Sequence, residues 1–187
     1  MICRSDLPRA SGAIALRVLA GLALATLLGL GLLSCRSVDW FLLKHSLRNQ
    51  FADVQWITTG QLADWIADRN RAQPILLDVR SRAEWRVSHL PRARLVLPET
   101  DPTPAVALLP KDTPIVTYCA IGYRSARAAQ QLRAAGYTQV RNLEGSIFEW
   151  ANERRPLICD GKPVSQVHPY SAFWGRLLEP EARAALP

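Results

Sequence analysis

The sequence predicts an α/β fold in which a mostly parallel central sheet is flanked by helices. Two runs, 74–78 and 115–119, are apolar without polar alternation, which is typical of strands buried on both faces. Amphipathic or alanine-rich stretches separate the candidate strands, and strands that alternate with helices favour a parallel sheet covered on both sides. With 187 residues, the chain has room for one such domain plus additional segments.

The alternation of strands and helices begins at Trp56. Thr58 or Thr59 can cap a helix whose apolar positions, Leu62, Trp65 and Ile66, share one face. We predict the following further elements: a strand at 74–78, a helical turn at 81–85, a strand at 93–97, a helix opened by Pro102 and Pro104 and running to 109, a strand at 115–119, a helix at 125–135 ended by Gly136, a strand at 139–143 and a helix at 145–152.

The amino terminus is a separate segment. Three arginines precede the uncharged apolar stretch 18–33, whose length falls between a signal-peptide core and a spanning helix. Adding 13–16 makes a membrane span possible, with Arg17 reaching toward the cytoplasmic surface. Leu32-Leu33-Ser34-Cys35 also resembles a bacterial lipobox, in which Cys35 would carry lipid.

Two interpretations of this segment stay open, a lipoprotein leader and an uncleaved hydrophobic anchor. Both place the domain at the bacterial cytoplasmic membrane, facing the periplasm, because basic residues stay inside. We expect a leader or anchor at 1–35, a connector at 36–53, the α/β domain at 54–157 and a carboxyl-terminal extension at 158–187. Residues 40–43 of the connector either lie at the membrane interface or belong to a first helix packed on the domain.

The net charge of +7, from 23 basic and 16 acidic residues, is spread along the chain. No basic cluster marks a nucleic-acid surface, so we expect no nucleic-acid partner. The sign still favours small anionic substrates and anionic lipid head groups. His45 and His168 are far apart in sequence and match no set of metal ligands, so we expect no metal.

The most informative segment is the loop Cys119-Ala120-Ile121-Gly122-Tyr123-Arg124-Ser125. A thiol at the carboxyl end of a buried strand, followed by a short loop and a helix, can be surrounded by backbone N–H groups and the positive helix end. Arg124 adds a fixed positive charge. Together these features should bring the thiol pKa into the range of roughly 3.5–7.5 found in reactive cysteines. Asp78 ends the other central strand and should face the same rim of the sheet.

Three motifs occur in order along the chain: Leu77-Asp78-Val79-Arg80 with Glu84-Trp85 and Ser88-His89-Leu90-Pro91, then Tyr118-Cys119 through Arg124-Ser125-Ala126-Arg127, then Asn142-Leu143-Glu144-Gly145-Ser146 with Trp150. Over 54–157 the chain therefore resembles the rhodanese family. The resemblance implies a three-layer rhodanese-like fold, here preceded by a hydrophobic amino-terminal helix. It also implies a sulfurtransferase that moves a sulfane sulfur from thiosulfate or a persulfide, through a Cys119 persulfide, to cyanide or a thiol. No separate cofactor is expected.

In this resemblance Cys119 is the nucleophile, and the loop residues Ala120, Ile121, Gly122, Tyr123 and Arg124 bind the substrate and the persulfide. Gly122 permits tight curvature. Arg124 either binds an anionic donor or pairs with an acidic residue. Asp78, Arg80 and Ser125 support the loop, and we interpret Glu84 as a structural partner of an arginine and His89 as a structural histidine.

The sequence departs from the family pattern at several positions. Ser88, Arg92 and Ser146 stand where glycine is usual, which removes freedom for positive φ. Ala120-Ile121 stand where many relatives carry arginine or another polar residue, so the pocket has one cation fewer and a more apolar wall. Four residues separate Cys119 from Arg124, one fewer than in related phosphatases, which favours sulfur transfer over dephosphorylation.

Two other functions remain open at this level. The chain can be a non-catalytic sulfur carrier or partner-binding module at the membrane, with the aromatic tail at 168–174 as a protein-docking surface, or a thiol phosphatase or reductase. Cys159 either resolves the Cys119 persulfide into a disulfide or is simply buried. The tail packs over the domain or docks to the membrane or to a partner.

Overall fold

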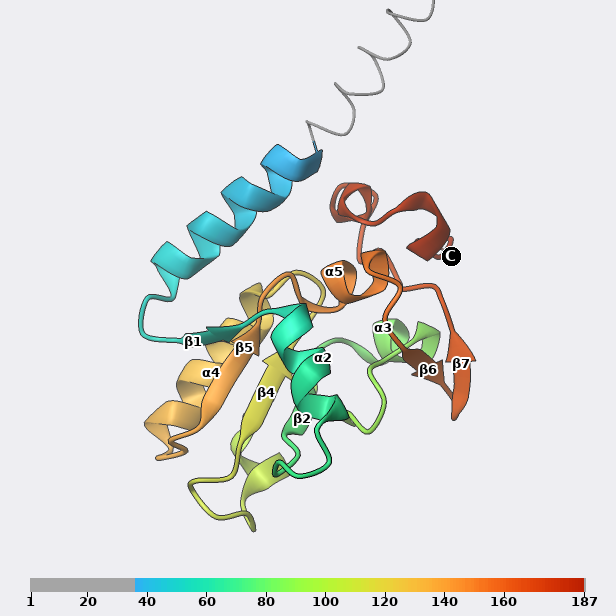
Figure 1. Cartoon of the computed structure of the whole chain (residues 1–187). Coiled ribbons are helices and arrows are strands. Elements are labelled where there is room, and N and C mark those ends of the chain that lie inside the picture. Colours follow the sequence, from blue (N-terminus) through green and yellow to red (C-terminus); the bar gives the residue numbers. More distant parts are fainter. Residues whose placement is uncertain (1–35, 187) are drawn as a thin grey trace, which may run out of the picture. The chain divides into compact units, whose positions relative to one another are not determined.

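A computed structural model describes residues 36–186, and the chain from Trp40 onward forms one compact unit. The hydrophobic stretch 13–33 and Cys35 lie outside the described residues. Five parallel strands form the main sheet in the order β1-β5-β4-β2-β3, and a separate antiparallel pair joins β6 and β7 (Figure 1). The strands are β1 (Gln55–Ile57), β2 (Ile75–Asp78), β3 (Arg94–Leu95), β4 (Ile115–Tyr118), β5 (Val140–Leu143), β6 (Leu157–Cys159) and β7 (Lys162–Val164).

Helices cover both faces of the main sheet, which gives the three-layer α/β fold predicted from the sequence. On one face lie α2 (Thr59–Ala67) and α5 (Ser146–Asn152), and on the other lies α4 (Tyr123–Ala134) (Figure 1). A short α3 (Arg82–Val87) follows β2. Three 3₁₀ helices lie at Thr103–Val106, Trp174–Leu177 and Pro180–Ala182.

Successive residues of the central strands pack into different cores. Leu76 and Val116 join the core beneath α2 and α5, whereas Leu77 and Ile115 join the core beneath α4. All four side chains are buried. This split follows from the period of two along a strand, and it explains why apolar residues occupy successive positions of both runs.

Two capping boxes define where α2 and α3 begin. The Thr58 hydroxyl accepts the backbone N–H of Gln61 while the Gln61 side chain accepts the N–H of Thr58. Ser81 and Glu84 make the same reciprocal pair at α3. Each box satisfies two backbone donors that a helix start leaves without partners.

Residues 36–50 are helical, and from Trp40 onward this helix packs on the domain. Leu47 and Phe51 are buried in the core beneath α4, and Trp40 and Leu43 are half-buried against the domain. Arg48 donates two hydrogen bonds of 2.8 Å to Glu144. The structure thus supports a first helix packed on the domain. No helix among residues 36–186 is long and apolar enough to cross a bilayer.

Several element boundaries differ from the sequence prediction. The strand expected at 93–97 is only Arg94–Leu95, and the helix expected up to 109 is a 3₁₀ turn at Thr103–Val106. The helix expected from Ser125 begins at Tyr123, because Gly122 with φ of 113° caps it and no capping side chain marks its start. The sequence analysis also missed β1, β6 and β7, which are three residues each.

Candidate active site

Cys119 directly follows β4 and lies at the bottom of the loop that leads into α4. Its sulfur accepts the backbone N–H of Gly122 at 3.1 Å, and its own N–H donates to the hydroxyl of Ser146 at 3.1 Å. The N–H of Ile147 donates to the carbonyl oxygen of Cys119. Cys119 is therefore held between the start of α4 and the start of α5.

Gly122 makes the sharp turn that brings this N–H to the sulfur. Its φ of 113° lies in a region that residues other than glycine rarely adopt. Its carbonyl accepts a 2.8 Å hydrogen bond from the buried Asn142 side chain. A Cβ at this position would contact Leu47 and Trp56 at 3.6 Å. The backbone conformation, more than the space, requires glycine here.

Arg124 is engaged by Glu84. The guanidinium donates two hydrogen bonds to the carboxylate, at 2.9 and 2.8 Å, and Glu84 is buried. On its other side the guanidinium carbon lies 4.9 Å from the ring centre of Tyr170. Of the two roles that the sequence left open for Arg124, the structure shows the pairing with an acidic residue.

Charge and hydrogen bonds activate the thiol. Burial alone would raise the pKa of Cys119, but the Arg124 charge and donors from Ser125 and Gly122 outweigh it, so the pKa is lowered. The buried Ser125 hydroxyl is not spent on any other described residue, so it can donate to the thiolate form of Cys119. A nucleophilic sulfur anion is the chemistry that this arrangement favours.

Asp78 and Arg80 lie outside the cavity at Cys119. The carboxylate accepts hydrogen bonds of 2.8 and 2.7 Å from the guanidinium, both side chains are fully buried, and Arg80 also donates to the carbonyl of Ser88. Burial would lower the pKa of Arg80, but the Asp78 charge raises it, so the guanidinium stays ionised. The pair fixes the segment after β2, next to Tyr118 at the end of β4.

A cavity of about 140 Å³ opens at Cys119. Its lining residues are Cys119, Ala120, Ile121, Tyr123, Arg124, Tyr170 and Trp174. The first five belong to the loop predicted from the sequence, and the last two come from the carboxyl-terminal extension, whose position the sequence did not predict. The aromatic cluster at 168–174 was the signal, but nothing in sequence relates it to a loop fifty residues away.

The three positions where the family usually has glycine, Ser88, Arg92 and Ser146, differ in their backbone φ. Arg92 and Ser146 adopt φ of 62° and 50°, so each side chain stands in the left-handed region. Ser88 has φ of −172°, which is ordinary extended backbone. The expected loss of conformational freedom thus applies at Arg92 and Ser146 and has no consequence at Ser88.

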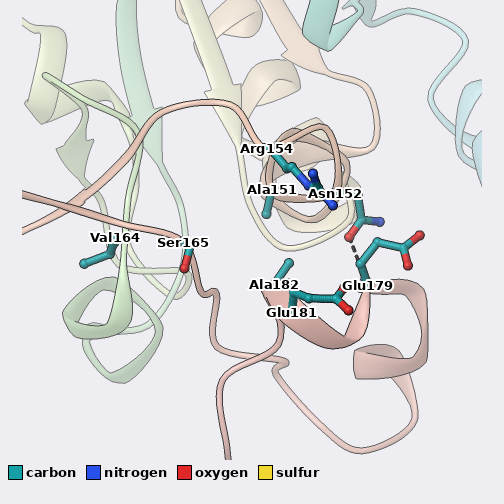
Figure 2. A pocket seen from close by; sticks show the side chains of 8 residues that line it. All are labelled: Ala151, Asn152, Arg154, Val164, Ser165, Glu179, Glu181 and Ala182. Atoms are coloured by element: carbon teal, nitrogen blue, oxygen red, sulfur yellow. Dashed lines mark hydrogen bonds between the residues drawn. The ribbon is translucent and has the colours of Figure 1, made fainter.

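A larger cavity, of about 510 Å³, contains neither Cys119 nor any residue of its loop (Figure 2). It lies between α5 and the extension, where the N–H of Glu179 donates to the Asn152 side chain at 2.7 Å. Its lining has no cysteine or histidine, and residues 36–186 hold no cluster of three or more metal-ligating side chains. The reactive thiol therefore identifies the smaller cavity as the candidate active site.

Cys159 lies in β6 and is half-buried. Its thiol donates to the carbonyl oxygen of Arg86 at 3.0 Å. Both Cys119 and Cys159 are free thiols in the described part of the chain. The redox role considered for Cys159 stays a prediction.

A parallel α/β sheet with a cysteine cradled at the carboxyl end of its central strand defines a class of thiolate-bearing domains. The sequence model of the family described as Rhodanese-like domain matches residues 58–153. The chain belongs to this family, which confirms the resemblance noted in its motifs.

Named relatives and solved structures agree with this assignment. A protein of Allochromatium vinosum named Sulfurtransferase is 34% identical over 106 residues, covering 57% of this chain and 96% of that protein. The probable adenylyltransferase/sulfurtransferase MoeZ of Mycobacterium tuberculosis is 34% identical over 109 residues, which span 57% of this chain but 27% of that protein. The rhodanese-like domain of an Anabaena protein shares the fold, with a TM-score of 0.51 at 24% identity over 58% of this chain and 84% of that one.

Proposed function

We propose that this protein is a sulfurtransferase that carries a sulfane sulfur on Cys119. The observation that carries the proposal is the sulfur of Cys119, buried in a loop that aims the N–H of Gly122 at it and places Arg124 beside it. The relative named Sulfurtransferase, matched over nearly its whole length, supports the same chemistry.

The reaction takes two displacements at sulfur. The Cys119 thiolate attacks the outer sulfur of thiosulfate, the sulfur–sulfur bond of the donor breaks, and sulfite leaves with the bonding electron pair. Cyanide then attacks the terminal sulfur of the Cys119 persulfide, the new sulfur–sulfur bond breaks, and thiocyanate leaves as the thiolate is restored. An organic persulfide and a thiol acceptor follow the same course, so no external oxidant or reductant is needed.

The size of the loop supports sulfur transfer over phosphate chemistry. Only four residues separate Cys119 from Arg124, and two N–H groups of the guanidinium are bound to Glu84. A phosphoryl group carries three equatorial oxygens that need donors around them. A single added sulfur atom needs far fewer hydrogen-bond donors. The N–H of Gly122 already points at the Cys119 sulfur, to which that atom would be bound.

Intact mass measurement of the purified full chain tests the proposal. After incubation with thiosulfate or with an organic persulfide, we expect a gain of one sulfur atom that cyanide removes. Cys119→Ser should show no gain, while Cys159→Ser, which keeps the proposed nucleophile, should load like the wild type. Absence of any gain with both donors overturns the proposal, and loading without release to cyanide or thiols supports a sulfur carrier instead.

We also propose that residues 1–35 hold the domain at the outer face of the bacterial cytoplasmic membrane. Basic residues ahead of an uncharged apolar stretch support this placement. Membrane fractionation and lipid labelling of the wild type and of Cys35→Ala test it. A lipoprotein should lose its label in the variant, an uncleaved anchor should never be labelled yet stay in the membrane, and recovery of the wild type in the soluble fraction contradicts both.

A further inference from the structure

The carboxyl-terminal extension supplies part of the wall around Cys119. Tyr170 and Trp174 line the cavity together with Ala120, Ile121 and Tyr123, so Arg124 is the one charged residue in an otherwise largely apolar and aromatic lining. Trp174 and Ile121 also pack against the core beneath α2 and α5. The aromatic wall is thereby continuous with the interior of the domain.

The wall is fixed by the fold. Val167 is fully buried, and its N–H donates to the carbonyl of Ala182 at 2.8 Å while its carbonyl accepts the N–H of Ala184. Leu178, just after the 3₁₀ helix that holds Trp174, is also fully buried. These contacts anchor the segment 167–178, which carries Tyr170 and Trp174, to the domain at both of its ends.

Tyr170 is held over the cavity in an unfavourable backbone conformation. Its φ of 63° lies in the left-handed region, and its N–H donates to the ring nitrogen Nδ1 of His168 at 3.0 Å. Such a conformation costs on the order of 1 kcal/mol and persists where the surroundings impose it, commonly at functional sites. About half of the Tyr170 side chain remains exposed, at 51%, so its burial alone does not account for its position.

The electrostatics of the cavity disfavour a small dianion. Two of the three guanidinium nitrogens of Arg124 each donate to Glu84, so the carboxylate offsets part of the positive charge that a ligand would meet. A doubly charged donor would lose its hydration against an apolar wall with little compensation. An apolar group would instead displace water from aromatic surface, which is favourable in proportion to the area covered.

From these observations we infer that the cavity binds the apolar carbon group of an organosulfur donor, with Tyr170 and Trp174 as the recognition wall. The volume of about 140 Å³ matches a group the size of a phenyl ring, since a cavity of about 150 Å³ holds benzene. The inference rests on the proposed sulfur transfer and names its substrate class. Cys119 attacks the outer sulfur of the donor, the sulfur–sulfur bond breaks, and the apolar fragment leaves with the electron pair.

Three sulfur donors distinguish the effect of an apolar carbon group on kcat/KM from the effect of the donor's charge and leaving group. Benzenethiosulfonate and methanethiosulfonate carry the same single charge and release a sulfinate, and thiosulfate is the dianion that releases sulfite. Thiocyanate formation from cyanide by the full chain gives kcat/KM for each. We expect benzenethiosulfonate to exceed methanethiosulfonate by roughly tenfold or more, because only its ring meets the aromatic wall.

Variants of the wall test the assignment. In Tyr170→Ala and Trp174→Ala the ratio of the two thiosulfonate kcat/KM values should fall toward one. Phe41→Ala, which removes an exposed aromatic ring outside the cavity, should leave the ratio unchanged. Ile121→Arg adds a cation to the wall and should shift preference toward thiosulfate, which tests the inference even where Trp174→Ala fails to fold.

The outcomes separate this inference from the proposed function. Turnover of all donors with equal thiosulfonate kcat/KM values, or an equal loss on both in the wall variants, overturns the aromatic recognition and leaves sulfur transfer standing. No turnover with any donor overturns both.

Discussion

Glu84 links the start of α3 to the guanidinium beside the nucleophile. Its carboxylate accepts the Ser81 N–H of the capping box and both hydrogen bonds from Arg124. Burial alone would raise the pKa of Glu84, but the Arg124 hydrogen bonds and charge lower it to about 2. One buried carboxylate thus fixes a helix cap and the orientation of Arg124 at the same time.

This lowered pKa predicts an acid-dependent contribution to stability. Because the folded-state pKa lies below the unfolded value, the stabilisation is complete above about pH 4.5 and is lost as the pH falls toward 2, in total roughly 3 kcal/mol. Glu84→Gln should lack this part of the pH dependence and should be less stable by a similar amount at neutral pH. Urea unfolding across this pH range measures both.

The matched control is Glu153→Gln, whose ion pair with Arg155 is on the surface, with side chains 37% and 27% exposed. A surface pair contributes at most about 1 kcal/mol, so the control should follow the wild-type pH dependence. The same acid dependence in Glu84→Gln as in the wild type would contradict the role assigned to this carboxylate.

Ser146 replaces a glycine that the family usually has, at a backbone φ of 50°. Its hydroxyl accepts the N–H of Cys119 and donates to the carbonyl of Leu143, both at 3.1 Å. Ser146→Ala keeps the backbone strain and leaves a buried N–H unsatisfied, so it should cost about 1–3 kcal/mol. Ser146→Gly relieves about 1 kcal/mol of strain and should cost less. Urea unfolding compares the two, and an equal loss would contradict the strain at this position.

At the residue scale the sequence reveals the parts of the site that are close together in the chain. Cys119, Gly122 and Arg124 lie within one loop, so their spacing predicts a cradle for sulfur. Tyr170 and Trp174 could not be placed, because a cluster of aromatic residues predicts burial or contact without giving its location. Glu84 could be recognised as an arginine partner, but several arginines in the sequence could have paired with it.

At the element scale, the strands buried on both faces were predicted, whereas of the two edge strands β1 was missed and β3 was predicted to be longer than it is. β2 and β4 are apolar at successive positions, whereas β1 and β3 have three and two residues and lie at the sheet edges. The hairpin of β6 and β7 has a recognisable signal in Asp160-Gly161, whose φ values of 48° and 75° suit a two-residue turn with both residues in the left-handed region. Asp-Gly between strands is the pattern that would have identified it.

Alanine substitutions test two glycines with positive φ, Gly161 in the hairpin turn and Gly145 at the start of α5. Gly161 has φ of 75° and open space around a Cβ, so Gly161→Ala should cost only the backbone strain, about 1 kcal/mol. Gly145, the N-cap of α5, has φ of 66°, and a Cβ there would lie 2.6 Å from Cβ of Glu149. Gly145→Ala should therefore cost a further 1–3 kcal/mol, roughly, for overpacking. Thermal and urea unfolding of both variants measure the difference, and equal losses would contradict the close approach at α5.

At the scale of the whole molecule, the carboxyl-terminal extension is part of the folded domain. Val167 and Leu178 are fully buried and belong to the same core as Ile147 and Phe148 of α5, although the family match ends at residue 153. Of the placements left open by the sequence, packing over the domain is the one that the structure shows. The extension thereby brings its aromatic residues to the cavity at Cys119.

Truncation of the extension should therefore weaken the entire domain. A chain ending after Val164 loses three large buried aliphatic side chains, Val167, Leu177 and Leu178, together with the smaller Ala182, and exposes the apolar surface beneath them. Since burying one such side chain contributes about 1.5–3 kcal/mol, we expect a loss of about 5 kcal/mol or more in the free energy of unfolding. A chain ending after Ala184 removes the exposed residues 185 and 186 with the last residue of the chain, and should keep the wild-type stability. Urea unfolding followed by circular dichroism measures both chains, and an unchanged midpoint after the longer truncation would show that the extension contributes nothing to the core.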